Sequence, residues 1–138
     1  MSGGVEVELE SLGSAATPVS VVELLATGVL RWRYKQGAVV DLEMAQLESR
    51  IIRELIGQHF EAGISLLIDI RGVERISREA RKFFASKEVH DAFGIRALAL
   101  LLGSPVSTLI GNFYQSVNRP VHPTRLFTTE AKAQLWLA

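Results

Sequence analysis

The sequence predicts a single α/β domain built on one mixed, largely parallel β-sheet, with an N-terminal hairpin and about four helices. Two short apolar runs, residues 65–70 and 95–102, have the composition of strands that are buried on both faces of a sheet. An amphipathic stretch follows each run, and this alternation of strand and helix favours parallel pairing. Thr27-Gly28 separates two further strand-like stretches and suits a tight turn, which adds the hairpin.

The first 18 residues are predicted to be a tail or an edge strand, and residues 19–138 are predicted to be the domain itself. Val5, Val7 and Leu9 alternate with glutamates, a pattern typical of an edge strand with one charged face. A disordered tail is the alternative. The stretch from Ser11 to Pro18 is predicted to be a loop.

Residues 19–25 and 29–35 are the predicted strands of the hairpin. In the second strand Leu30, Trp32 and Tyr34 point to one face of the sheet, and the basic residues between and after them point to the other. A solvated strand face is the simplest interpretation of the basic stripe, and a binding surface is the alternative.

A first helix is predicted from Asp41, a suitable N-cap, to about Gln58. Its apolar residues follow helical spacing and form a stripe. The members of the stripe are Met44, Leu47, Ile51 and Leu55, broadened by Ile52 and Ile56. After the strand at 65–70, Ser77 is predicted to cap a second helix that reaches about Phe93 and ends at Gly94.

The strand at 95–102 leads through Gly103-Ser104-Pro105 into a third helix, with Pro105 at its first position. The apolar stripe of this helix consists of Val106, Leu109, Ile110, Phe113, Tyr114 and Val117. Residues 124–127 form a short last strand, and Thr128 or Thr129 caps a final helix. The inward residues of that helix are predicted to be Ala131, Leu135 and Trp136.

Composition excludes several classes of function. Fifteen basic residues balance fifteen acidic ones, which leaves no basic field for a phosphate backbone and argues against nucleic-acid binding. The chain of 138 residues has no cysteine, so disulfides, thiol catalysis and cysteine-based zinc sites are excluded. The apolar fraction of 48% is high for a small domain, which indicates that a partner covers part of the surface.

The chain also lacks the marks of export or membrane insertion. Its first ten residues carry glutamates instead of the basic segment of a signal peptide. Residues 97–118 hold no charge, but glycine, proline and polar residues interrupt them, so we expect no spanning helix there. By elimination we expect a cytoplasmic protein.

Five short motifs in the second half of the chain occur in a familiar order. They are Ile-Asp-Ile-Arg-Gly-Val at 68–73, Ile-Ser-Arg-Glu-Ala-Arg at 76–81, Gly-Ser-Pro-Val-Ser at 103–107, Gly-Asn-Phe at 111–113 and Pro-Thr-Arg-Leu-Phe at 123–127. This set covers about half of the chain and resembles the bacterial STAS-like (SpoIIAA-like) proteins of unassigned function. The resemblance implies a regulatory or interaction module.

The resemblance also directs attention to the turn before the second helix. In anti-sigma-factor antagonists a serine of an Asp-Ser-Ser-Gly turn is phosphorylated at this position. Here Ser77 falls where that family has aspartate, and Arg78 and Glu79 replace the two serines. The phosphorylation switch is therefore not implied for this chain. We interpret Ser77 as an N-cap, and Glu79 as a permanent negative charge is the alternative.

Candidate ligand residues follow from the expected sheet edge, because ligands gather where parallel strands end and helices begin. The residues proposed for binding a ligand or anion are Ser77, Ser104, Ser107, His122 and Arg125. Ordinary helix capping is the alternative for the serines. The three histidines lack the spacing of metal ligands, so no metal is expected. Asp69, on a central strand, is expected to pair with Arg71, Arg96 or Arg125.

The third helix carries small uncharged groups where a solvent-facing helix usually has charges. They are Thr108, Gly111, Asn112 and Gln115, with serines beside them. Depletion of charge is typical of interface centres. We therefore predict that this helix packs against a second copy of the chain or lines a groove; a well-covered helix within the monomer is the alternative.

These observations favour a non-enzymatic interaction or regulatory module that resembles STAS-like domains, acting as a homodimer or with a protein partner. The alternative is a binder of a small ligand, either apolar as in the CRAL-TRIO lipid-binding proteins or anionic at helix N-termini. No nucleophile or acid–base pair stands at recognisable spacing, so neither an enzyme nor a cofactor is expected.

Overall fold

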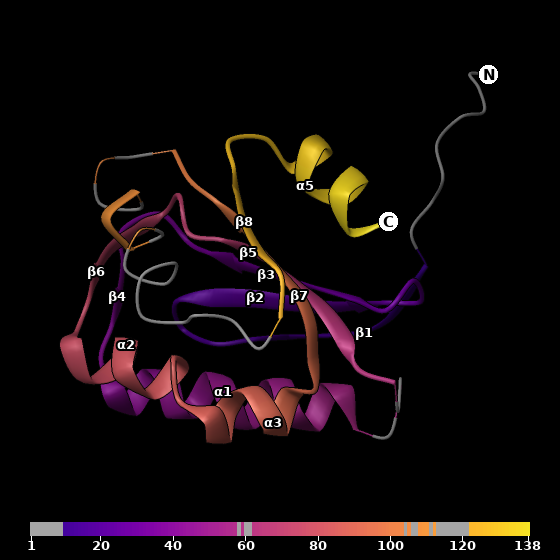
Figure 1. Cartoon of the computed structure of the whole chain (residues 1–138). Coiled ribbons are helices and arrows are strands. Elements are labelled where there is room, and N and C mark those ends of the chain that lie inside the picture. Colours follow the sequence, from indigo (N-terminus) through magenta and orange to yellow (C-terminus); the bar gives the residue numbers. More distant parts are fainter. Residues whose placement is uncertain are drawn as a thin grey trace.

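The structure is a computed structural model, and it describes residues 10–57, 59, 62–103, 105, 108–110, 112 and 122–138. Its main element is a six-stranded sheet in the order β1-β2-β3-β5-β7-β8 (Figure 1). The strands are β1 (Ser11–Ala16), β2 (Ser20–Leu25), β3 (Val29–Tyr34), β5 (Ile64–Asp69), β7 (Ile95–Leu101) and β8 (Thr124–Phe127).

The sheet is mixed, as the sequence predicts. β1, β2 and β3 pair in antiparallel fashion, whereas β3, β5, β7 and β8 run parallel to one another. The predicted hairpin is the β2–β3 pair, and the two apolar runs of the sequence are the neighbouring inner strands β5 and β7. The predicted fold class is therefore confirmed.

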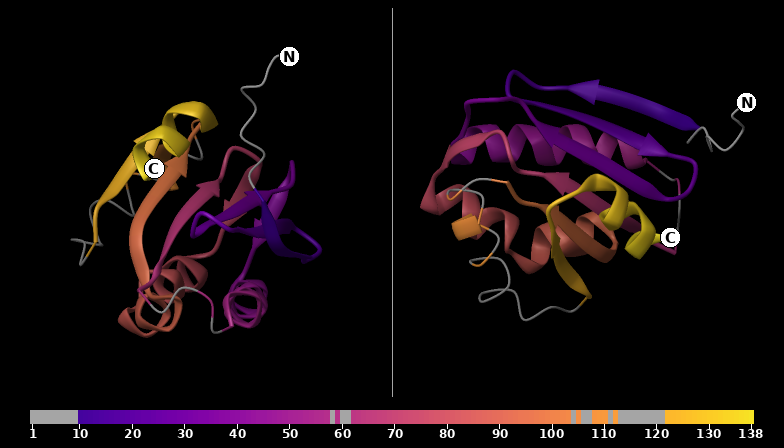
Figure 2. Two further views of the ribbon diagram at one scale, coloured as in Figure 1. Left: turned by 90° about the vertical axis from the view of Figure 1, so that its right-hand side faces the viewer. Right: turned by 90° about the horizontal axis from the view of Figure 1, so that it is seen from above.

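Helices cover both faces of this sheet, but unequally (Figures 1 and 2). On one face lie α1 (Leu42–Ile56), α2 (Arg78–Phe84) and α3 (Lys87–Phe93), and on the other lies α5 (Glu130–Leu137). The larger core fills the space beneath the first three helices and includes Leu30, Trp32, Ile52 and Leu100. A smaller core lies beneath α5 around Leu67 and Ala133.

A second sheet of two strands stands where the parallel strands finish, and the sequence did not predict it. β4 (Ala38–Val40) and β6 (Val73–Ile76) pair in parallel. Gly72 lets the two segments approach, because a Cβ on it would lie 2.6 Å from the carbonyl oxygen of Lys35. The strands are too short to show a period of their own in the sequence.

The predicted loop from Ser11 to Pro18 is wrong, because residues 11–16 form the edge strand β1. Small residues with little strand propensity make up β1, so its sequence does not alternate visibly. Pairing with β2 and packing on α1 hold it instead: Gly13 approaches Leu55 so closely that a Cβ would lie 3.0 Å from Cδ1. The strand predicted around Val5 and Leu9 lies outside the described residues.

The single helix predicted from Ser77 to Phe93 is instead two helices. Ser77 caps α2 and Gly94 ends α3 in the left-handed conformation, as predicted. Between them, Ser86 caps α3 by accepting from the backbone N–H of Val89, while its hydroxyl donates to the carbonyl oxygen of Phe83 at 2.6 Å. Serine favours such local bonds over a continuous helix.

Asp41 and Thr129 cap α1 and α5, which confirms those predicted helix starts. The sequence predicts less well which apolar residues of α5 point into the core. On α5, Ala133 is buried and Trp136 half-buried, but Leu135 is 79% exposed and Ala131 is also exposed, so these two do not face inward.

Of the predicted third helix the structure describes only a part. Residues 105, 108–110 and 112 are helical. Ile110 is buried, as its place in the apolar stripe predicts, but Leu109 is 70% exposed, which corrects that stripe. Among the described residues, none of the helices is both long and apolar enough to cross a membrane.

Candidate functional site

The candidate site is the end of the sheet at which β3, β5 and β7 finish. The small β4–β6 sheet lies here, and α1 and α2 begin here (Figure 1). Ser77 stands at the centre of this end. Its Oγ accepts from the backbone N–H of Ala80 at 3.0 Å, and its own N–H donates to the carbonyl oxygen of Val40 at 2.9 Å. The side chain therefore works as the N-cap that the sequence predicts.

Exposed apolar side chains accompany Ser77 at this end. Val39 on β4 is 38% exposed, Leu42 at the start of α1 is 36% exposed, and Leu109 follows the end of β7. Thr108 and Asn112, on the same helical segment, are exposed as well, whereas Gly111 and Gln115 of the predicted self-association face lie outside the described residues. The end of the sheet thus offers exposed apolar and uncharged polar side chains to a partner, beside charged ones such as Arg75 and Arg78.

Asp69 and Arg71 form a rigid charged pair at the end of β5. Arg71 donates from Nε to Oδ1 at 2.9 Å and from Nη2 to Oδ2 at 2.8 Å, a bidentate arrangement that lowers the pKa of Asp69 against the effect of its burial. The stem of Arg71 lies on Gly103, where a Cβ would come within 2.9 Å. This confirms one of the pairs expected for Asp69, and it gives Gly103 a packing role.

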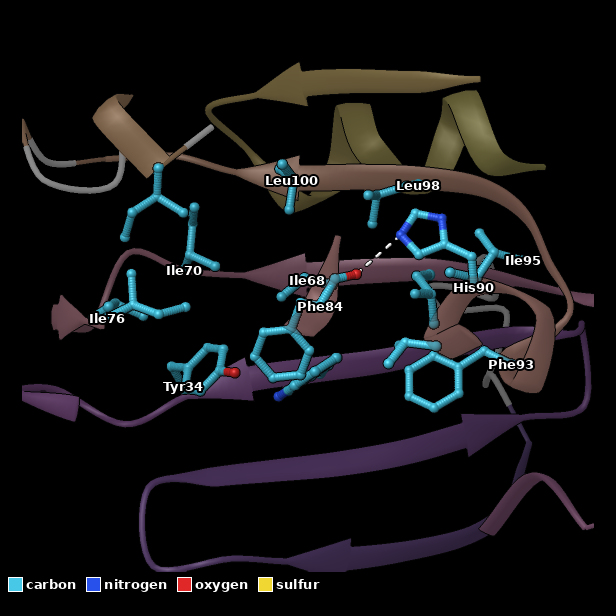
Figure 3. A pocket seen from close by; sticks show the side chains of 15 residues that line it. Tyr34, Ile68, Ile70, Ile76, Phe84, His90, Phe93, Ile95, Leu98 and Leu100 are labelled. Atoms are coloured by element: carbon cyan, nitrogen blue, oxygen red, sulfur yellow. Dashed lines mark hydrogen bonds between the residues drawn. The ribbon is translucent and has the colours of Figure 1, made fainter. Parts of the chain in front are cut away.

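An apolar pocket lies between the sheet and α2 and α3 (Figure 3). Its walls are aliphatic and aromatic side chains from β3, β5 and β7 and from the two helices, with the ring of His90 as a polar element. The volume is about 40 Å³. A buried water needs roughly 10–15 Å³ on this measure, so the pocket has room for about three waters and none for a lipid chain.

A buried carboxyl group next to this core is the most unusual polar feature of the molecule. Glu48 of α1 is 1% exposed and accepts from Ser20 Oγ at 2.6 Å, Trp32 Nε1 at 3.1 Å and Tyr34 Oη at 2.8 Å. All three donors are neutral. Burial raises the pKa of Glu48 to about 7, and the three hydrogen bonds limit that rise.

Glu48 also ends a hydrogen-bond chain that begins in the backbone. The N–H groups of Val19 and Ser20 donate to Thr17 Oγ1. Thr17 Oγ1 lies 2.8 Å from Ser20 Oγ, which in turn donates to the carboxyl group of Glu48. The chain ties the turn between β1 and β2 to the middle of α1, so that a helix and a hairpin share one polar contact inside an apolar core.

His122 forms a pair with His90 instead of facing solvent. Their rings stack with centroids 4.9 Å apart, and His122 Nε2 lies 2.9 Å from His90 Nδ1. His90 Nε2 must donate to the carbonyl oxygen of Phe84 at 3.0 Å, so neutral His90 accepts at Nδ1 from His122 (Figure 3 shows the bond to Phe84). Burial and the neighbouring His90 lower the pKa of His122.

The basic stripe of β3 is covered in part by α5. Arg31 is 26% exposed and reaches Glu130 of α5 at 3.0 Å and Glu23 of β2 at 3.4 Å. A fully solvated strand face is therefore wrong for Arg31, although Arg33 and Lys35 are exposed. Arg125 lies on the rings of Phe127 and Trp136, with its guanidinium carbon 5.7 and 5.8 Å from their centroids.

The structure does not bring the predicted ligand residues together where it describes them. Ser77 follows the end of β6, His122 lies before the start of the parallel strand β8, and Arg125 faces α5. Ser104 and Ser107 lie outside the described residues. Sequence analysis missed Glu48, although a glutamate one helical turn from Ile52 and Met44 was a usable signal.

The arrangement of sheet and helices is that of a SpoIIAA-like fold. An uncharacterized protein of the DUF3478 family with a SpoIIAA-like fold, from Shewanella loihica PV-4, matches with a TM-score of 0.61 at 12% identity, over 99% of this chain and 100% of that one. The anti-sigma factor antagonist SpoIIAA in its unphosphorylated form matches with a TM-score of 0.55 at 14% identity, over 85% and 96%.

Residues 24–138 match the family model described as a domain of unknown function (DUF7793), and the chain belongs to this family. A search of the curated proteins finds no match. At these identities the two solved structures establish the fold, which confirms the resemblance drawn from the sequence motifs.

Proposed function

We propose that this domain is a non-enzymatic regulatory module that binds another protein through the end of the sheet where the parallel strands finish. The observation that carries the proposal is the group of exposed apolar side chains there, Val39, Leu42 and Leu109. Exposed apolar groups beside uncharged polar ones are typical of protein-binding surfaces. The proposal retains the expectation of a cytoplasmic protein.

Two further observations support a binding role at this end. Asp69 and Arg71 are fixed by their bidentate bond, and Ser77 is fixed by capping, so the surface around them is rigid before any partner arrives. One of the matching structures is described as an anti-sigma factor antagonist, a protein that acts on another protein. We extend to this chain only that general mode of action.

Binding of an apolar ligand in the core is the weaker candidate. The pocket between the sheet and α2 and α3 has a volume of about 40 Å³, which is small against the 300–1,000 Å³ of typical ligand sites. Native mass spectrometry of the purified protein tests this alternative, because a stoichiometric mass increase in place of the bare chain would favour it.

Site-specific photo-crosslinking in the producing cells tests the proposal. A benzophenone amino acid at Leu42 or Leu109 should give one discrete adduct with the same protein, identified by mass spectrometry. Leu135 is the matched control, because it is 79% exposed and lies on α5, on the other face of the sheet. Adducts that are absent from Leu42 and Leu109, or identical for all three positions, would contradict the proposal.

A further inference from the structure

The outer edge of β1 carries main-chain groups that point away from the sheet. Among the residues that the structure describes, β1 is the first strand in the sheet order and pairs with β2 alone. The backbone N–H of Thr17 donates to the carbonyl oxygen of Ser20 at 2.9 Å, which makes these two residues a hydrogen-bonded pair. Because such pairs alternate along an antiparallel ladder, the N–H and C=O groups of Ala16 and Ser14 point outward.

This edge lacks most of the devices that prevent strands from adding to a sheet, although the pairing of β1 with β2 shifts register between Ser11 and Gly13. β1 is six residues long and contains neither a charge nor a proline. The opposite edge of the same sheet has both kinds of protection: β8 is four residues long, contains the exposed Arg125 and follows Pro123. Short length, charge and proline are the usual means of blocking an edge, so the two edges of the molecule differ in kind.

An apolar helix flank lies beside the unprotected strand. The predicted stripe of α1, formed by Met44, Leu47, Ile51 and Leu55, is only half-buried, and the buried residues of the helix are Ala45, Glu48, Ser49, Ile52 and Ile56. The opposite flank faces α3 across a groove lined by Gln46, Arg50 and Arg53. The stripe therefore points away from α3, toward β1, where Leu55 meets Gly13.

Together, β1 and this stripe, which meet at Gly13 and Leu55, form what we call the β1–α1 edge. Figure 2 shows the ribbons of β1 and α1 on the same side of the molecule. It combines two features that arise independently in the sequence: a strand whose outward main-chain groups have no partner among the described residues, and a helix stripe that the chain's own core covers only in part. Each of them alone is common on protein surfaces. Their coincidence on one side of the molecule indicates a surface built for a partner that supplies both a strand and an apolar helix.

We infer that the β1–α1 edge binds a second copy of this chain. A two-fold axis perpendicular to the sheet sets β1 antiparallel to its counterpart, with Ser14 near the axis, and places the two α1 stripes against each other beneath the extended sheet. Neither β1 nor the stripe carries a charge, so the symmetric contact opposes no like charges. This surface lies apart from the end of the sheet, and the inference does not depend on the proposed function.

The experiment uses the absence of cysteine from the chain. Ser14→Cys introduces a single thiol at the proposed axis, and a short bismaleimide should convert this variant into a covalent dimer. Arg125→Cys on the β8 edge is the control for random collision. Leu109→Cys tests the third helix as the alternative contact. We expect crosslinking at position 14 to exceed that of both controls by at least tenfold.

The mass of the unmodified protein completes the test. Light scattering should give the dimer mass, and Ser14→Lys or Ile51→Glu should raise the dimer dissociation constant at least tenfold with unchanged circular dichroism. A wild-type protein that is monomeric up to millimolar concentration overturns the inference. A dimer that crosslinks through Leu109→Cys and not through Ser14→Cys also overturns the inference. The crosslinking comparison does not use the charged variants, so it remains decisive even if one of them fails to fold.

Discussion

Glu48 is a carboxyl group held in an apolar core by neutral donors. Three donors satisfy the acceptor positions of the carboxyl group, but they do not replace the hydration that the charged form loses. The charged and neutral forms are therefore close in free energy near neutral pH, with the pKa at about 7. A single residue thus links the packing of α1 on the hairpin to the proton concentration.

The first prediction concerns the pH dependence of stability. The pKa of Glu48 is about 7 in the folded chain against 4.5 as its ordinary value. A raised pKa means that the folded state binds the proton more tightly, so this contribution to stability is complete below pH 4.5 and is lost as the pH rises through 7. The free energy of unfolding of the wild-type chain should therefore fall by about 3 kcal/mol over this range. Glu48→Gln cannot ionise, so its unfolding free energy should not show this fall.

Urea unfolding of both proteins between pH 5 and pH 8 measures this effect. The difference in unfolding free energy between wild type and Glu48→Gln should change with pH in the direction that favours the variant at high pH. A constant difference across the range would show that Glu48 keeps an ordinary pKa. Glu54, an exposed glutamate of the same helix, provides the control substitution Glu54→Gln, for which we expect no such change.

The second prediction concerns the His90–His122 pair, whose pH dependence has the opposite sign. The pKa of His122 is lowered in the folded chain, so its contribution to stability is present above pH 6.5 and is lost as the pH falls. His122→Phe should cost about 1–2 kcal/mol near pH 8, because Nδ1 of the part-buried His90 loses its donor. The cost should shrink toward pH 5.

A double-mutant cycle checks the assignment. Because both residues take part in one bond, His90→Phe and His122→Phe together should destabilise the chain by less than the sum of the single substitutions. Additive effects, or a cost of His122→Phe that grows toward low pH, would contradict the paired neutral tautomers.

At the scale of elements, helix starts depend on single capping residues. Ser77 begins α2 at the end of the sheet where we place the binding surface. Capping alone predicts that Ser77→Ala costs about 1 kcal/mol and that Ser77→Asp, which also caps well, costs little. Thermal unfolding of the two variants distinguishes these roles. If the hydroxyl itself were needed, Ser77→Asp would lower the midpoint of unfolding as much as Ser77→Ala does.

Local signals explain which elements the sequence predicted. The caps Asp41 and Ser77 and the left-handed Gly94 act through neighbouring backbone groups, and the apolar runs of β5 and β7 reflect burial on both faces. β1 has no such signal, since its strand form comes from β2 and from Leu55. The apolar spacing changes phase between Phe84 and Val89, so the break at Ser86 left a signal in the sequence that the prediction did not use.

The candidate site was predictable only in part, for a related reason. The sequence identified Ser77 as a cap and included Arg71 among three partners for Asp69, and both observed contacts are close in the chain. Burial of Glu48 by Ser20, Trp32 and Tyr34, and of His122 by His90, joins residues 14 to 32 positions apart. Likewise, the exposure of Leu109 depends on what packs around the helix and not on its spacing.

At the scale of the whole molecule, we propose two distinct surfaces for binding. The end of the sheet holds Leu42 and Leu109, and the β1–α1 edge holds Ser14 and Ile51. A dimer through the edge would carry two copies of the end surface, one on each side of the two-fold axis. A partner with two matching sites would then bind with increased avidity, without any additional contact within either surface.

Dimerisation through the edge has a consequence for stability, and this is the last prediction. Only the folded chain can pair, so dimer formation stabilises the folded state by mass action. Where the protein is a dimer, each tenfold rise in concentration adds about 1.4 kcal/mol per dimer. This should raise the midpoint of thermal unfolding by about 2–4 °C. Ser14→Lys, which places two positive charges at the axis, should abolish the concentration dependence while leaving the midpoint of the dilute protein unchanged. A wild-type midpoint that is independent of concentration would mean that folding and association are not coupled through this edge.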